Sequence, residues 1–178
     1  MAGAYKSRHH RRKANHNQRK IKEDITMLKE NYEQMHRRIQ AEVNALPMHW
    51  AFSDTQWKAL LNELGLTEAE AKEQLVSGIG NAIYRKSDAQ HIHDTFSRHE
   101  AELSAAIENM EFLEDAFYYE MCNHEYAINM QGKYDVLDCL GFDVEYENEM
   151  ACLTDDQKKA WKNARNRYYK DADEKGWY

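Results

Sequence analysis

The stretch SDTQWKALLNELG, residues 53–65, decides the class of fold. Its first residue, Ser53, stands three places before Gln56, which is the spacing of a capping box at the start of a helix. Gly65 closes the stretch, and glycine often follows the last turn of a helix because it accepts the left-handed backbone conformation. The stretch therefore predicts a helix over about residues 54–64.

The same start signal recurs along the chain. It pairs Thr67 with Glu70, Ser87 with Gln90, and Thr154 with Gln157. These pairs predict a helix over about residues 68–77, a long helix after Ser87, and a last helix over about residues 155–173. Two further helices are expected, over about residues 111–127 and 134–140.

The scarcity of turn residues also points to helices. Seven glycines and one proline, Pro47, leave few places where the chain must turn sharply. Only the stretch GIGNAIYRK, residues 78–86, is typical of an irregular segment or a short strand. We therefore predict a mainly α fold: a compact helical domain with a long N-terminal helix and at most a short β-hairpin near residues 79–86.

The N-terminal part divides into an arm and a helix. Residues 1–17 have almost nothing to bury and are expected to form a disordered basic arm. Residues 18–46 predict one amphipathic helix with coiled-coil spacing, which Pro47 ends. This helix could form a homodimer through residues 21–46, or pack against the helical globular domain expected over residues 48–178.

The charge is unevenly distributed. The net charge is -7, yet residues 1–20 hold seven lysines and arginines and no acid. Residues 100–149 hold fourteen acids against the single basic residue Lys133, a net charge of -13. Such a division indicates charged partners rather than a particular fold.

The basic arm predicts contact with RNA or DNA, because lysines and arginines neutralise phosphates. The candidate contacts are Arg8, Arg11, Arg12, Lys13, Arg19 and Lys20. Alternatively, the arm is a solubility tail, or it pairs with the acidic part of a second copy.

The acidic region predicts binding to a basic protein surface, because carboxylates can imitate a nucleic-acid backbone. The candidate residues are Glu100, Glu102, Glu108, Glu111, Glu114, Asp115 and Glu120. The alternative is an ordinary solvated helix face.

Neither catalysis nor a metal is predicted. The chain has no GxSxG motif and no glycine-rich phosphate loop. Cys122 and His124, and the pair His91 and His93, have the right ligand types for zinc but the wrong spacing. We expect no enzyme activity, no cofactor and no metal.

The three cysteines are widely spaced and odd in number, so free thiols in a reducing compartment are expected. There is no run of 18 apolar residues that could span a membrane. A cytoplasmic protein, in a bacterial host cell, is the expectation.

Several short stretches carry a family resemblance. They are AFSDTQW at 51–57, YRKSD at 84–88, FSRHE at 96–100, CNHEY at 122–126 and DCLGF at 138–142. In these the chain resembles a family of short, mostly uncharacterised proteins encoded on bacteriophages and conjugative elements of Firmicutes. In size, charge and inferred origin the chain is also similar to type II anti-CRISPR proteins, which inhibit Cas9.

The resemblance implies an interaction protein that inhibits a host nucleic-acid-guided nuclease, by binding guide-loaded Cas9 and blocking DNA binding or cleavage. The alternative function is that of a dimeric nucleic-acid-binding accessory or regulatory protein, which would use its basic arm.

Overall fold

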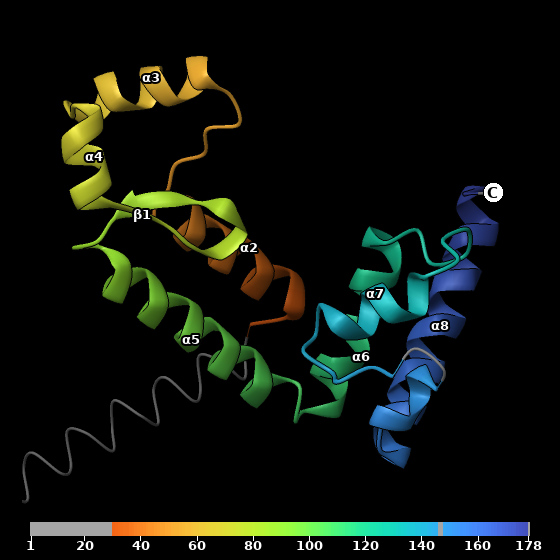
Figure 1. Cartoon of the computed structure of the whole chain (residues 1–178). Coiled ribbons are helices and arrows are strands. Elements are labelled where there is room, and N and C mark those ends of the chain that lie inside the picture. The colour runs from red at the N-terminus through yellow and green to blue at the C-terminus, as the bar shows by residue number, and fades with distance from the viewer. Residues whose placement is uncertain (1–29, 146–147, 178) are drawn as a thin grey trace, which may run out of the picture. The chain divides into compact units, whose positions relative to one another are not determined.

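The computed structural model describes residues 30–145 and 148–177 of the chain (Figure 1). The predicted arm, residues 1–17, and the first part of the helix predicted over residues 18–46 lie outside these residues. The described part is mainly helical, with one two-stranded antiparallel hairpin, which confirms the predicted fold class. No described helix is long and apolar enough to cross a membrane.

The chain divides into two units by its internal contacts. Residues 38–101 form one unit, here called the hairpin unit. The described parts of residues 1–37 and 102–178 form the other, here called the C-terminal unit. Helices α2 (Tyr32–Asn44) and α5 (Ala89–Ala106) cross the boundary between these ranges.

Helix α3 (Asp54–Leu64) of the hairpin unit has the predicted bounds. The Ser53 side chain accepts a hydrogen bond from the backbone N–H of Gln56 at 3.2 Å, and Gly65 takes the left-handed conformation with φ 65°. The end signal at Gly65 therefore acts as predicted, while the capping box is half formed, because the Gln56 side chain accepts its hydrogen bond from Phe52 rather than from Ser53.

Helix α4 (Glu68–Gln74) has the predicted capping box but ends three residues before the predicted boundary. The chain passes directly into strand β1 (Leu75–Ser77), which pairs antiparallel with β2 (Ile83–Arg85). The helix ends early because the residues that follow it form a strand, in which Val76 lies opposite Tyr84. Local sequence does not encode this pairing, since it depends on the partner strand.

The turn between the strands contains the short 3-10 helix η1 (Ile79–Asn81), where Gly80 and Asn81 both have positive φ. Gly78 is required for packing, since a Cβ atom there would clash with the ring and hydroxyl of Tyr84. The buried residues of the hairpin unit form two clusters: Leu46, Ala82, Tyr84 and Ile92, and Leu61, Ala71 and Leu75.

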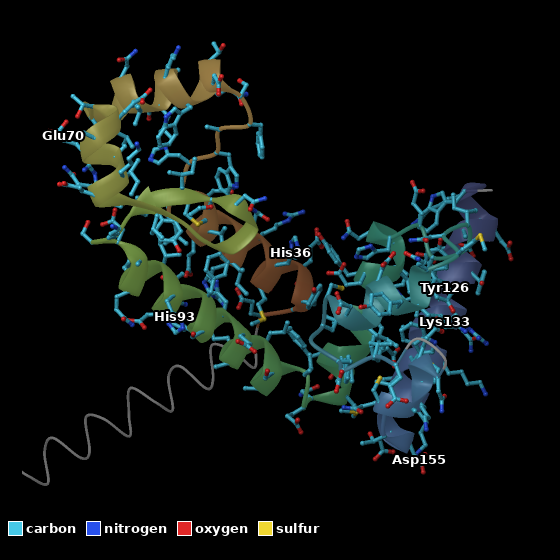
Figure 2. All side chains as sticks on the ribbon, viewed as in Figure 1. His36, Glu70, His93, Tyr126, Lys133 and Asp155 are labelled. Carbon is cyan, nitrogen blue, oxygen red and sulfur yellow. The ribbon has the colours of Figure 1, made fainter. Side chains whose placement is uncertain are left out.

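The C-terminal unit is built on two helices, α6 (Met110–Asn123) and α8 (Asp155–Lys175). Along the chain, α7 (Gly132–Asp138) and the 3-10 helix η2 (Glu149–Cys152) come between α6 and α8. Figure 2 shows Asp155 at the end where α8 starts, and Thr154 forms the predicted capping box there with Gln157.

The core of this unit lies between α6 and α8. The Phe117 ring meets the Trp161 ring edge to face, with centroids 5.0 Å apart. Leu113, Phe117 and Met121 are fully buried, while Cys122 is only partly buried. Helix α6 stops at Asn123, short of the predicted residue 127, because the chain turns through Glu125 with φ 49°.

Candidate functional site

The acidic candidates of the sequence lead to a groove between the N-terminal halves of α6 and α8. The groove has a volume of about 500 Å³ and is open to solvent. Its lining residues are Met110, Glu111, Glu114 and Asp115 from α6, and Asp156, Lys159, Ala160 and Asn163 from α8. Four carboxylates therefore face one lysine. We call this site the acidic groove.

Helical spacing explains why these side chains share one hollow. Glu111, Glu114 and Asp115 are three and four residues apart, so they lie on one face of α6, and Asp156 and Asn163 lie on one face of α8. The two helices run in the same direction. Accordingly Glu114 meets Asn163 near the start of the pair, and Tyr118 meets Asp171 further along.

The starts of both helices favour negative charge here. Asn109 caps α6 by accepting hydrogen bonds from the backbone N–H groups of Glu111 and Phe112, and Thr154 caps α8. Glu111 and Asp156 lie in these first turns, where the helix dipole stabilises a carboxylate. The fold therefore tolerates a concentration of acids at this end of the unit.

Contacts within the chain neutralise part of this charge. Asn163 donates a hydrogen bond to Glu114 at 2.9 Å, and Arg167 pairs with Asp115 at 2.9 Å. Lys159 pairs with Asp156 at 2.7 Å, which lowers the pKa of the Asp156 carboxyl. The Lys159 and Asp156 side chains are about three-quarters exposed, and exposed ion pairs contribute little free energy. A cation of a partner could therefore replace Lys159 beside Asp156 at little cost in free energy.

The other predicted partner residues lie elsewhere. Glu108 is exposed before α6, Glu102 is partly buried, and Glu100 is exposed in the hairpin unit. Glu120 is buried, with only 2% of its surface exposed, so it offers no surface to a partner. The predicted nucleic-acid contacts all fall in residues 1–20, outside the described residues.

Sequence reasoning missed the contribution of α8 to the groove. Asp156 and Asn163 belong to no recognisable sequence motif. The capping box at Thr154 shows that Asp156 belongs to a first helical turn. Only the packing of α8 beside α6 places it next to Glu111 and Glu114.

A second cluster surrounds the buried carboxylate of Glu120. Its Oε1 accepts a hydrogen bond from the Tyr32 hydroxyl at 2.5 Å, and its Oε2 accepts one from the Asn123 amide at 3.0 Å. His124 Nε2 lies 3.5 Å from the same Oε2, and the Cys139 thiol completes a set of donor atoms within 4.8 Å of one another. Cys139 is exposed as a residue, but its thiol is partly buried and donates a hydrogen bond to the Val136 carbonyl, and this burial together with the Glu120 charge raises the pKa of the thiol. These three types of donor atom could hold a metal ion.

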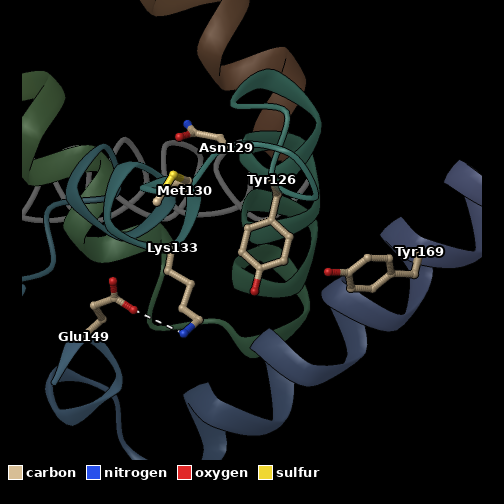
Figure 3. Close-up of a pocket in the computed structure, with 6 residues that line it drawn as sticks. All are labelled: Tyr126, Asn129, Met130, Lys133, Glu149 and Tyr169. Carbon is tan, nitrogen blue, oxygen red and sulfur yellow. Dashed lines mark ion pairs between the residues drawn. The ribbon is translucent and has the colours of Figure 1, made fainter. Parts of the chain in front are cut away.

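A third hollow, of about 150 Å³, lies between helix α8 and the loop that follows α6 (Figure 3). It is lined by Tyr126, Asn129, Met130, Lys133, Glu149 and Tyr169. Lys133 and Glu149 form an ion pair at 3.3 Å within it. The single lysine of the acidic region, Lys133, is thus already paired within the chain, with about half of its side chain exposed.

Two histidines of α5, His93 and His99, have different surroundings. His93 is exposed, whereas His99 is buried in the hairpin unit and its Nε2 lies 2.9 Å from Glu42 Oε2. Hydrogen bonds from His99 and Arg98 lower the pKa of Glu42 to about 2. His99 therefore belongs to a hydrogen-bonded ion-pair network.

The fold and site define a mainly helical protein with an acidic groove on its C-terminal unit. The chain belongs to a family of unknown function, DUF7659, whose model matches residues 31–163. That range contains all the stretches quoted above for the sequence resemblance. No curated protein and no solved structure matches the chain.

Proposed function

We propose that the protein inhibits a nucleic-acid-guided nuclease of a bacterial host by binding its basic nucleic-acid channel. The partner to test first is Cas9 loaded with guide RNA, and the protein acts by occupying a surface, without catalysis. The single observation that carries this proposal is the acidic groove, where Glu111, Glu114, Asp115 and Asp156 line one open hollow. Origin on a phage or conjugative element is part of the proposal and rests on the sequence resemblance.

The chemistry of the groove favours a lysine or arginine of the partner. A protein that clamps a nucleic-acid backbone presents rows of these side chains, and closely spaced carboxylates offer them a substitute for phosphates. Glu111 is exposed at the groove, and Asp156 is held only by an exposed ion pair with Lys159. A cation of the nuclease can therefore replace the solvent around Glu111 and the Lys159 side chain beside Asp156.

The test is co-purification of the full chain with Cas9, with and without guide RNA, followed by a DNA-cleavage assay on the same sample. The groove variant carries Glu111→Lys and Asp156→Lys. The matched control carries Glu68→Lys and Glu73→Lys, which change the net charge equally on exposed positions of α4.

We expect the unmodified chain and the control to bind and to reduce cleavage, and the groove variant to lose both effects. Binding should weaken as salt is added, because the attraction is between solvent-exposed charges. Absence of binding by the unmodified chain, or equal losses in both variants, would contradict the proposal.

A second function rests on a different observation, the seven basic residues and no acid in residues 1–20. With these the protein would act as a nucleic-acid-binding accessory or regulatory protein, dimerised through residues 21–46. Gel-shift titrations at several salt concentrations should then show steeply salt-dependent binding to DNA or RNA. Deletion of residues 1–20 should abolish it. Under the first function, the same deletion weakens inhibition only in part.

A further inference from the structure

We propose that Glu120, His124 and Cys139 bind one zinc ion between the end of α6 and the end of α7. This site goes beyond the proposed function and shares no residue with the acidic groove. Its role would be to fasten α7 and the loop before it to α6.

The fold brings the three ligands together from two separate segments. Glu120 and His124 are four residues apart at the end of α6, so they lie on the same side of the helix. The chain then turns back through residues 125–131, and Cys139 follows the last turn of α7. The carboxylate oxygen, imidazole nitrogen and thiol sulfur all lie within 4.8 Å of one another. Ligands around tetrahedral zinc are roughly 3.5 Å apart, so small side-chain rotations would close the site.

A positive charge beside Glu120 would stabilise its buried carboxylate. Its side chain is 3% exposed, and Tyr32 and Asn123, which donate hydrogen bonds to it, are uncharged. A buried carboxylate is costly unless it is paired with a cation or holds a metal. His124 lies 3.5 Å from Glu120 and forms an ion pair with it only when the imidazole is protonated. Zinc would supply the positive charge with His124 neutral.

Tyr32 and Asn123 also fit the role of orienting groups. Carboxylates that bind metals are commonly held by hydrogen bonds from a second layer of residues. Here each oxygen of Glu120 has one such donor, at 2.5 Å from Tyr32 and 3.0 Å from Asn123. The carboxylate is therefore fixed in place before any ion arrives.

The types of ligand atom favour zinc over other metals, and the site is open enough for an ion to enter. Nitrogen and sulfur donors suit zinc far better than magnesium or calcium, which prefer oxygen. His124 is partly exposed and Cys139 exposed, so an ion can enter. Three protein ligands leave a fourth position for water.

Cobalt(II) tests the site directly, because it replaces zinc and gives a near-ultraviolet absorption band only when a thiolate binds it. The full chain, free of any tag and stripped with a chelator, is titrated with cobalt(II) and then with zinc. We expect one equivalent of cobalt to produce the band, and one equivalent of zinc to remove it. Histidines of the N-terminal arm, His9, His10 and His16, cannot produce this band, because residues 1–20 contain no cysteine.

Cys139→Ser is the decisive variant because this residue is exposed, so the change should leave folding intact. It should abolish the cobalt band and weaken zinc binding by at least about tenfold. His124→Gln should weaken zinc binding similarly. The controls are Cys122→Ser and Cys152→Ser, which remove the other two thiols and should keep the band.

Circular dichroism of each variant confirms that it is folded. The proposal is overturned by the absence of a band in the unmodified chain, by a band that survives in Cys139→Ser, or by a band lost only with Cys122 or Cys152. A zinc stoichiometry that disappears when His9, His10 and His16 become alanine would assign the metal to the arm instead.

Discussion

At the scale of single residues, Glu42 shows how a partly exposed acid can contribute to stability. Its carboxylate is met by His99 and Arg98, and Arg38 approaches at 3.4 Å. These partners lower its pKa to about 2 from its ordinary value of 4.5. Since the folded pKa lies below the unfolded one, the stabilisation is fully present above about pH 4.5 and is lost as the pH falls toward 2.

Glu42→Gln should therefore lower the free energy of unfolding by about 1 kcal/mol at pH 7, after allowance for solvent screening of a side chain that is 36% exposed. The difference between variant and unmodified chain should shrink toward pH 2. Urea unfolding at several pH values measures it. Glu73→Gln, an exposed acid on α4, serves as control and should show no such trend. A difference independent of pH would argue against the ion-pair account.

At the scale of elements, two of the four predicted capping boxes, at Thr67 and Thr154, form in full, whereas Ser87 bonds to the Asp88 side chain instead. The Thr154 side chain accepts a hydrogen bond from the backbone N–H of Gln157, and the Gln157 side chain accepts one from the Thr154 backbone. Helix α8 carries one wall of the acidic groove, so its first turn also positions Asp156. Stability and the proposed binding site thus depend on the same cap.

Thr154→Ala should destabilise the chain by about 1 kcal/mol, because the backbone N–H of Gln157 loses the hydroxyl that accepts its hydrogen bond. Thermal unfolding measured by circular dichroism gives the change. Thr55→Ala, at an exposed position inside α3, replaces the same residue type without a cap and should be neutral or slightly stabilising. If both variants lost equal stability, the effect could not be assigned to the cap.

At the scale of the whole molecule, the two units have separate cores. Phe117 is fully buried between α6 and α8 in the C-terminal unit. Leu61 is buried with Ala71 and Leu75 in the hairpin unit. Each core therefore packs residues of its own unit, although helices α2 and α5 contribute residues to both units.

Phe117→Ala should cost about 3–5 kcal/mol and Leu61→Ala about 2–5 kcal/mol, as buried large-to-small changes do. Hydrogen exchange followed by mass spectrometry should show the faster exchange mainly in residues 102–177 for the first variant and in residues 54–85 for the second. Equal acceleration everywhere in both variants would mean that the units unfold as one.

The sequence by itself determined the helical class and many helix ends. Ser53, Gly65 and Thr154 act within one turn of their own helix, so their effect can be read from neighbouring residues. Strand β1 was missed because Leu75 and Val76 find their partners ten and eight residues away, across the hairpin.

Only the tertiary structure decided the sites. Glu114 and Asn163 are 49 residues apart, and they meet because α6 and α8 pack through Phe117 and Trp161. Glu120 appeared in the sequence as one acid among many, yet α6 turns it inward against Tyr32, 88 residues away. Such contacts depend on which helices bury their apolar faces against each other, and that is a property of the folded chain rather than of any local pattern.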